Sequence, residues 1–125
     1  TIIKQKEVSI AAPQIKTNVF YTNGKSQIPG VSVGILPEEA QLMYNIKSYM
    51  VEGNYDFLSQ NINGIIIGSG IAEKMNSTIN DNINLTSSKG INRTFKIIGI
   101  FKTNNSAIDK TKSLQPYLRK TATDS

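Results

Sequence analysis

The chain has 125 residues with a formal net charge of +5, and it contains neither Cys nor His. Its length predicts one domain, and its 38% hydrophobic and 18% charged residues are typical of a globular protein. The composition excludes disulfides and thiolate zinc sites, and it removes the commonest general base and the commonest transition-metal ligand. We therefore predict no catalytic, cofactor-binding or metal site.

The first third of the chain is predicted to form two extended segments joined by a turn. Residues 8–21 are rich in β-branched and aromatic residues, and Pro13 suits an edge strand or a bulge. Residues 22–25 contain Asn-Gly, which tolerates the positive φ of a turn. In residues 26–36, alternation places Val31, Val33 and Ile35 on one face of a strand.

A helix is predicted to begin at Pro37 and to continue to Gly53. Proline fits the first helical turn, and Glu38 and Glu39 suit the positive end of the helix dipole. Helical spacing gives one apolar stripe, which is interpreted as core; contact with an acyl chain is the alternative. The stripe consists of Leu42, Met43, Ile46, Tyr49 and Met50.

The residues after this helix, 54–64, are predicted to form a loop, with a helical turn as an alternative. Tyr55, Phe57 and Leu58 are large apolar residues within it. Aromatic residues in exposed loops often make contacts with partners. These three residues are the candidate interaction loop.

In the stretch GIIIGSGIAEKMN, residues 65–68 are predicted to form a short buried strand. Residues 69–76 are predicted to form a short helix with Ser69 as a possible N-cap and Ile71, Ala72 and Met75 inward. Gly68 and Gly70 match the start of a dinucleotide-binding Gly-x-Gly-x-x-Gly motif, but the third position is Glu73. No Walker motif is present either. The two glycines are expected to permit a tight turn between strand and helix.

Two further strands, residues 82–86 and 91–102, are predicted to form a hairpin through Lys89 and Gly90. The second strand is apolar on both faces, which is typical of a central strand. Phe95, Ile97 and Phe101 would share one face and Ile98 and Ile100 the other. Residues 103–113 are predicted to be a loop, and a short helix is predicted to begin at Pro116.

The order and spacing of these blocks resemble the extracytoplasmic core domain of ABC transporter permeases of the MacB/LolC/LolE (FtsX-like) class. The similar segments are VSVGILPEEAQLMYNIKSYMVEGNYDFL, GIIIGSGIAEKMN, NDNINLTS and FKIIGIFKT, and the resemblance covers about residues 30–109. GIFKT with Asp109 is more similar to the lipoprotein-releasing LolC/LolE branch. Asn80 and Asn104 stand where the family has glycine, and both are expected to tolerate a left-handed backbone. The apolar strand that usually follows Asp109 is either diverged or lost.

The resemblance implies an α+β fold: a mixed sheet with one longer helix and short helices. Residues 1–125 would be a single extracytoplasmic, periplasmic-type domain cut from a cell-membrane permease. The implied partners are a cytoplasmic ABC ATPase, a second permease copy or paralogue, and an extracytoplasmic cargo or chaperone protein. ATP hydrolysis would drive the movement or release of a lipoprotein, peptide or drug, and the domain itself would not be an enzyme.

Two other functions are compatible with the residues alone. Nine of the 14 basic residues but only four of the nine acidic ones lie in residues 63–125. Phe95, Phe101 and the neighbouring Lys and Arg could therefore form a platform for single-stranded nucleic acid, although a buried strand explains them better. A hydrolase would have to use Asp81 or Asp109, which are expected to form turns instead.

Overall fold

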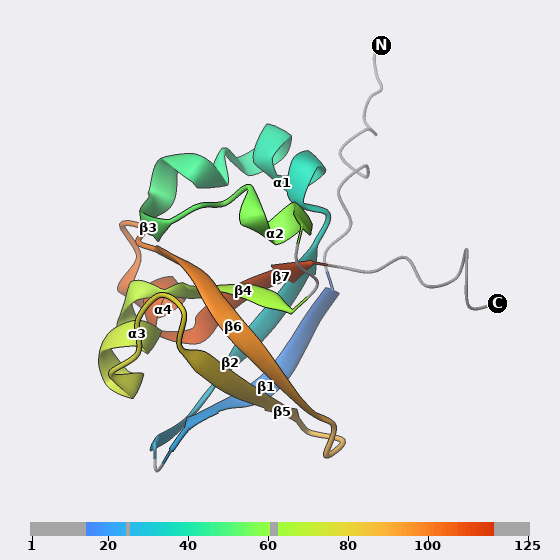
Figure 1. The fold of residues 1–125 in the computed structure, drawn as a ribbon, viewed down its shortest axis with the longest axis vertical. Helices are drawn as coiled ribbons and strands as arrows, with labels where there is room; N and C mark the ends of the chain where they lie inside the picture. Colours follow the sequence, from blue (N-terminus) through green and yellow to red (C-terminus); the bar gives the residue numbers. More distant parts are fainter. Residues whose placement is uncertain (1–14, 25, 61–62, 117–125) are drawn as a thin grey trace, which may run out of the picture.

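The fold is a mixed sheet of seven strands in the order β3-β6-β4-β7-β2-β1-β5. A computed structural model describes residues 15–24, 26–60 and 63–116 (Figure 1). β5 also pairs with β6, so six of the strands form a closed ring and β3 extends β6 outside it. The strands are β1 (Ile15–Asn23), β2 (Ser26–Ile35), β3 (Met50–Gly53), β4 (Gly64–Gly68), β5 (Asn82–Ser87), β6 (Asn92–Phe101) and β7 (Lys112–Pro116).

The helices are short and lie at two places on this sheet. They are α1 (Pro37–Tyr44), the 3-10 helix η3 (Ile46–Tyr49), α2 (Phe57–Gln60), α3 (Ser69–Met75) and α4 (Ser106–Thr111). Figure 1 shows α1, η3 and α2 above one end of the sheet, and α3 beside α4 on its flank. The pairs β2–β7 and β4–β6 are parallel and the other pairs are antiparallel, which confirms the predicted α+β class with a mixed sheet.

The predicted long helix is wrong beyond Tyr44. Asn45 adopts the left-handed conformation with φ of 51°, which ends α1 after eight residues. The chain then forms η3, and Met50–Gly53 becomes β3, antiparallel to β6. Ile46 alone of the predicted apolar stripe is buried and Met50 is half-buried, so the stripe as a whole is not a core face.

The strand–helix unit of residues 64–75 agrees with its prediction except at the helix cap. All five residues of β4 are buried, and Ile71 and Met75 of α3 point into the core. The N-cap is Gly68, without a side-chain cap bond, and Ser69 is already the first helical residue. The prediction that Ser69 caps the helix is therefore wrong.

The predicted turns between β1 and β2 and between β5 and β6 are present. In β6, however, Ile100 and Phe101 lie on the opposite faces from those predicted. Gly24 has φ of +65° in the turn between β1 and β2, and Gly90 has φ of +84° between β5 and β6. Pairing of β4 with β6 shifts register between Ile97 and Gly99, which is a bulge. Because of this shift, Ile100 lies with Phe95 and Ile97 in one core cluster, while Phe101 lies with Ile98 in the other.

The predictions for the C-terminal quarter are mostly wrong. Residues 106–111 form α4 rather than a loop, and β7 lies in the sheet between β4 and β2. A strand after Asp109 is therefore present in a diverged sequence. Pro116 ends β7, and the predicted helix after it lies outside the described residues, as does Pro13. Of the two asparagines that replace family glycines, Asn80 is left-handed with φ of 77°, whereas Asn104 is not.

Two core clusters occupy opposite faces of the central strands. Ile65 and Ile67 of β4 belong to the cluster between β1, β4, β5, β6 and α3, whereas Ile66 belongs to the cluster under α1 and η3. A strand that is buried on both faces shows no polar alternation, which explains the run of isoleucines. The helical layer formed by α1, η3 and α2 is thus attached to the sheet through its own apolar core.

Candidate functional site

Most of the exposed large apolar side chains in the described residues belong to one layer of the molecule. We call the layer formed by α1, η3, β3 and α2 the cap. Of the nine large hydrophobic side chains that are exposed in the described residues, six belong to the cap. Clusters of exposed apolar side chains mark interaction surfaces more often than isolated ones do. The six residues are Leu42, Met43, Tyr44, Tyr49, Val51 and Phe57, with Leu42 the most exposed at 86%.

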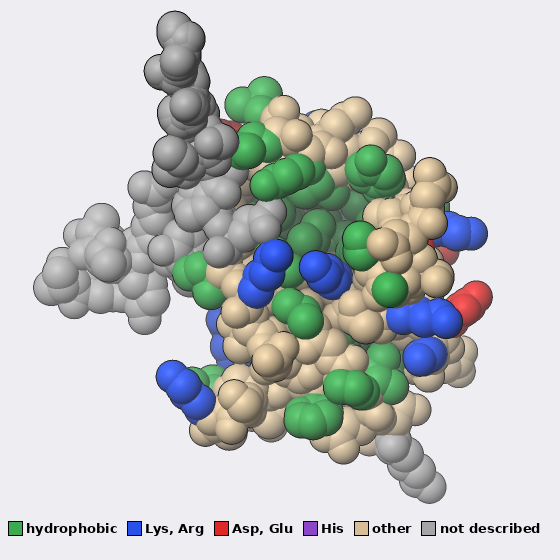
Figure 2. Space-filling model, turned by 180° about the vertical axis from the view of Figure 1, so that it is seen from behind, with side chains coloured by type: hydrophobic (Ala, Val, Ile, Leu, Met, Phe, Trp, Pro, Cys, Tyr) green, Lys and Arg blue, Asp and Glu red, His purple; other side chains and the backbone are tan. Residues whose placement is uncertain are grey.

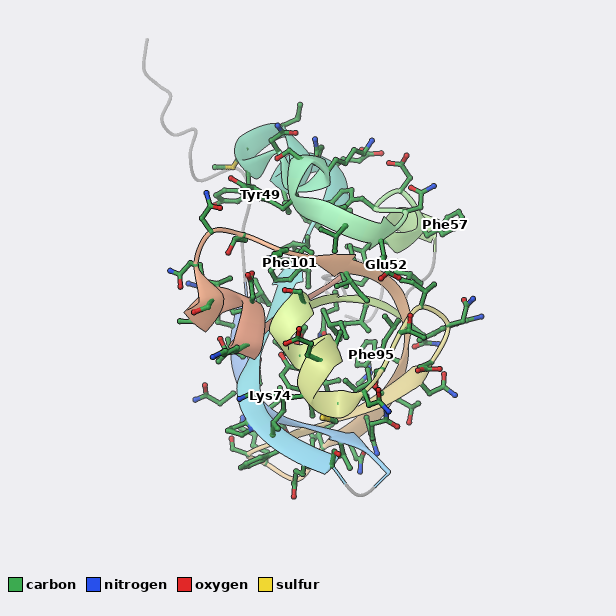
Figure 3. The ribbon with its side chains drawn as sticks, turned by 90° about the vertical axis from the view of Figure 1, so that its left-hand side faces the viewer. Tyr49, Glu52, Phe57, Lys74, Phe95 and Phe101 are labelled. Atoms are coloured by element: carbon green, nitrogen blue, oxygen red, sulfur yellow. The ribbon has the colours of Figure 1, made fainter. Side chains whose placement is uncertain are left out.

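The structure divides the candidate interaction loop into one exposed and two buried residues. Phe57 is 49% exposed and projects from the end of the cap (Figure 3). Tyr55 and Leu58 are 4% and 0% exposed and belong to the core under the cap, so the expectation that they are exposed is wrong. The helical turn α2 causes this, because it points Leu58 inward and Phe57 outward. The interaction role stays a prediction, and it now rests on Phe57.

Tyr55 connects the loop to the start of α1. Its hydroxyl donates to the carbonyl oxygen of Pro37 at 2.6 Å. Burial, with a smaller effect of the negative charge of Asp56, raises the pKa of Tyr55 to about 12. The phenol is therefore neutral at physiological pH and keeps the proton that this hydrogen bond needs. Its role is to hold the two ends of the cap together.

Backbone hydrogen bonds attach the cap to the sheet. The amide of Lys102, just after β6, donates to the carbonyl oxygen of Tyr49 at 2.8 Å, and the amide of Asn54 donates to Ile98 at 3.3 Å. Gly53 has φ of +84° and lies so close to β6 that a Cβ atom there would be 2.1 Å from the Ile98 carbonyl oxygen. The cap is therefore connected to β6 at both ends of β3.

The carboxylates weighed as catalytic groups have structural roles instead. Glu38 and Glu39 lie in the first turn of α1, as predicted. Asp81 accepts a hydrogen bond from the Thr78 amide at 2.9 Å in a turn. Asp109 is buried in α4, and its Oδ1 accepts from both the amide and the hydroxyl of Thr103 at 2.9 Å. Within the described ranges, no three acidic side chains are placed to hold a metal ion.

The aromatic platform suggested for nucleic acid is not available at the surface. Phe95 and Phe101 are both buried, and Figure 3 shows them inside the molecule. The guanidinium of Arg93 lies 4.7 Å from the centroid of the Phe95 ring and covers it. Base stacking requires an exposed ring face. The interpretation of these residues as a buried strand is confirmed.

The glycines of the Gly-x-Gly sequence permit close packing of α4. A Cβ atom on Gly68 would lie 2.2 Å from the carbonyl oxygen of Asp109, and one on Gly70 would lie 2.9 Å from the Cα atom of Lys110. Neither glycine has a positive φ. The two glycines are therefore needed for the close approach of α4 and not for a tight turn. The local sequence could not reveal this, because α4 lies about 40 residues further along the chain.

Comparison with known proteins gives one family and a consistent set of folds. The model of the family described as the MacB-like periplasmic core domain matches residues 1–121. No curated protein sequence gives a match. Within the described residues, no helix is long and apolar enough to cross a membrane.

Three solved structures have the same fold at low sequence identity. The extracellular domain of the noncanonic ABC-type transporter YknZ from Gram-positive bacteria has a TM-score of 0.61 and 11% identity, over 90% of this chain and 57% of that one. The periplasmic region of MacB from Actinobacillus actinomycetemcomitans has a TM-score of 0.60 and 12% identity, over 90% of this chain and 50% of that one. A domain described as part of a permease from Porphyromonas gingivalis has a TM-score of 0.59 and 18% identity, over 84% of this chain and 45% of that one.

The chain spans about half the length of these solved structures. At identities below 20%, the TM-scores of these structures show a shared fold alone. The family model, in contrast, matches the sequence over nearly every residue of the chain. Together with the mixed sheet, these findings assign the chain: it belongs to the family of MacB-like periplasmic core domains.

Proposed function

We propose that this chain is the extracytoplasmic domain of an ABC transporter permease, where it transmits ATP-driven movement to cargo or to a partner protein. The single observation that carries the proposal is the family match over residues 1–121. ATP would be hydrolysed by a cytoplasmic ATPase subunit or domain. The domain would act with a second copy or paralogue of the permease, at the outer face of the membrane.

The packing supports a mechanical role. The ring of strands has apolar core on both faces of β4 and β6, and such packed bodies move as units rather than deforming. The cap is connected to β6 through β3, so a force on the cap would reach the sheet through paired backbone. We infer that the cap, with Phe57 exposed, is the contact surface.

Within the family, we favour the lipoprotein-releasing LolC/LolE branch. The GIFKT sequence at residues 99–103 and Asp109 are the features that lean toward it. In the structure they are joined, because Asp109 accepts two hydrogen bonds from Thr103. Lipoprotein, peptide and drug cargo are the classes to be compared in a transport assay.

Cysteine labelling of the full-length protein in intact cells tests the location and the contact surface. Residues 1–125 contain no Cys, so a single substitution gives the only thiol within this domain, and labelling of the unsubstituted full-length protein is the background. Phe57→Cys is expected to react with a membrane-impermeant maleimide, whereas Ser113→Cys, which is fully buried, is expected to react only after denaturation. Failure of Phe57→Cys to react in intact cells, with labelling after lysis, would contradict the extracytoplasmic location.

The same variant tests the mechanical cycle. Crosslinking of Phe57→Cys to a neighbouring copy or partner should change between the ATP-bound and nucleotide-free states. Lys89→Cys, in the hairpin turn far from the cap, is the matched control (Figure 1). Equal crosslinking of both variants in every nucleotide state would contradict force transmission through the cap.

A further inference from the structure

A groove on the back of the molecule combines an apolar floor with basic residues. Figure 2 shows the hollow, with hydrophobic side chains inside it and Lys or Arg side chains at its edge. It has a volume of about 550 Å³ and lies between the cap, α4 and the face of β2 and β7. This volume is within the range of small-molecule sites in proteins. Its apolar lining includes Val33, Ile35, Phe101, Ile108 and Leu114.

The sheet register brings two lysines to this groove. Lys16 of β1 is opposite Val33 of β2, and Lys112 of β7 is opposite Val31. Paired residues point to the same face, and so do residues two apart in a strand, so both lysines share the face of Val33. Their Cα atoms flank β2, roughly 12 Å apart by standard strand spacings. Two flexible ammonium groups can therefore meet at one edge of the groove.

Among the described residues, no opposing charge lines the groove. Of the residues that line it, none is acidic, and Lys16 and Lys112 are its only charged residues. In the described part of the chain, neither lysine forms an ion pair, whereas Lys47 of the cap pairs with Asp56 at 3.0 Å. An apolar groove with two cations that have no ion-pair partner among the described residues is complementary to a molecule with an apolar body and an anionic end.

We propose that this groove binds a single-chain anionic amphiphile, with its hydrocarbon chain on the apolar floor and its carboxylate at Lys16 and Lys112. The proposal goes beyond the transport role. Binding of the amphiphile would be a property of these 125 residues, and it can be measured without an assembled transporter. The half-exposed rings of Tyr44 and Tyr49 line the groove from the cap and would cover part of the chain.

Displacement of a fluorescent fatty acid tests the proposal. Dansylaminoundecanoate is titrated into the protein, and palmitate, hexadecanol and hexadecyltrimethylammonium are added as competitors below their micelle concentrations. Palmitate is expected to displace the probe in a saturable way. Hexadecanol, which has the same chain without the charge, should be about tenfold weaker, and the cationic amphiphile should not compete.

Variants separate the two parts of the site. Lys16→Gln combined with Lys112→Gln should weaken palmitate about tenfold and leave hexadecanol unchanged, since exposed ion pairs contribute a few-fold each. Lys47→Gln with Lys89→Gln makes the same charge change outside the groove, and palmitate binding should stay within twofold of the unmodified protein. Tyr49→Ala should weaken palmitate and hexadecanol alike. Circular dichroism and thermal melting check that each variant is folded.

Several results would overturn the proposal. They are the absence of saturable probe binding, equal displacement by hexadecanol and palmitate, and equal palmitate affinity in the groove variant and its charge-matched control. Displacement by a hexaglutamate peptide at the affinity of palmitate would assign the surface to an acidic protein segment instead. None of these results would bear on the extracytoplasmic location, which the maleimide experiment tests separately.

Discussion

Replacing Tyr21 with Phe removes one hydroxyl group from the point where three strands and a helix meet. The hydroxyl oxygen lies 3.0 Å from the carbonyl oxygens of Val31 in β2 and Thr111 at the end of α4, and 2.8 Å from Oγ of Ser113 in β7. Tyr21 and Ser113 are completely buried, and burial raises the pKa of Tyr21, so its phenol stays protonated. The side chain thus joins β1 to β2, to the end of α4 and to β7.

The expected loss in the free energy of unfolding is about 2–3 kcal/mol. One hydrogen bond is donated by the phenol and one is shared with the Ser113 hydroxyl, and each contributes about 1 kcal/mol. The substitution also leaves the buried Ser113 hydroxyl without its bond to Tyr21. A fully unsatisfied buried group costs about 1–3 kcal/mol, and part of this cost is added here. For a chain of this size, this loss corresponds to a melting temperature lower by roughly 8–12 °C.

Urea unfolding followed by far-ultraviolet circular dichroism measures the effect. Tyr44→Phe is the matched control, because Tyr44 is half-exposed and its hydroxyl has no partner among the described residues. Combining Tyr21→Phe with Ser113→Ala should give a coupling energy of about 1 kcal/mol in a double-mutant cycle. A loss below about 0.5 kcal/mol, or one equal to that of Tyr44→Phe, would refute the role given to this hydroxyl.

Two further predictions concern packing and pH. Gly68→Ala should lower the free energy of unfolding by about 3 kcal/mol, because its Cβ would lie 2.2 Å from the backbone of Asp109. Gly24→Ala is the control: there is open space around Gly24, but its φ is +65°. It should lose only about 1 kcal/mol in the same urea assay. Equal losses would contradict the close approach of α4. The free energy of unfolding should also fall above pH 10, because Tyr55 ionises there in the unfolded chain but only near pH 12 when folded. Tyr55→Phe should reduce this alkaline slope, and an unchanged slope would refute the raised pKa.

The short-range patterns of the sequence determined the elements whose signals are local. The Asn-Gly and Lys-Gly turns, the start of α1 at Pro37 and the strand–helix unit of residues 64–75 depend on backbone preferences and on apolar periodicity within a few residues. The order of these blocks was sufficient to identify the family resemblance, which the family match over residues 1–121 confirms.

The tertiary structure decided where the chain departs from its local pattern. Met50–Gly53 continues a helical pattern in the sequence, but it becomes a strand because the edge of β6 supplies hydrogen-bond partners. β7 has little apolar alternation, and its inward Ser113 is accommodated only because the distant Tyr21 bonds to it. The bulge in β6 moves Phe101 to the other core.

The same distinction applies to the candidate sites. Loop position indicated Tyr55, Phe57 and Leu58 as a group, but only the packing of this segment against the sheet left Phe57 exposed and buried the other two. Lys16 and Lys112 are 96 residues apart in the sequence and share a groove because β1 and β7 both pair with β2. Local preferences fix how a segment folds on itself, whereas strand pairing between distant segments fixes which side chains meet.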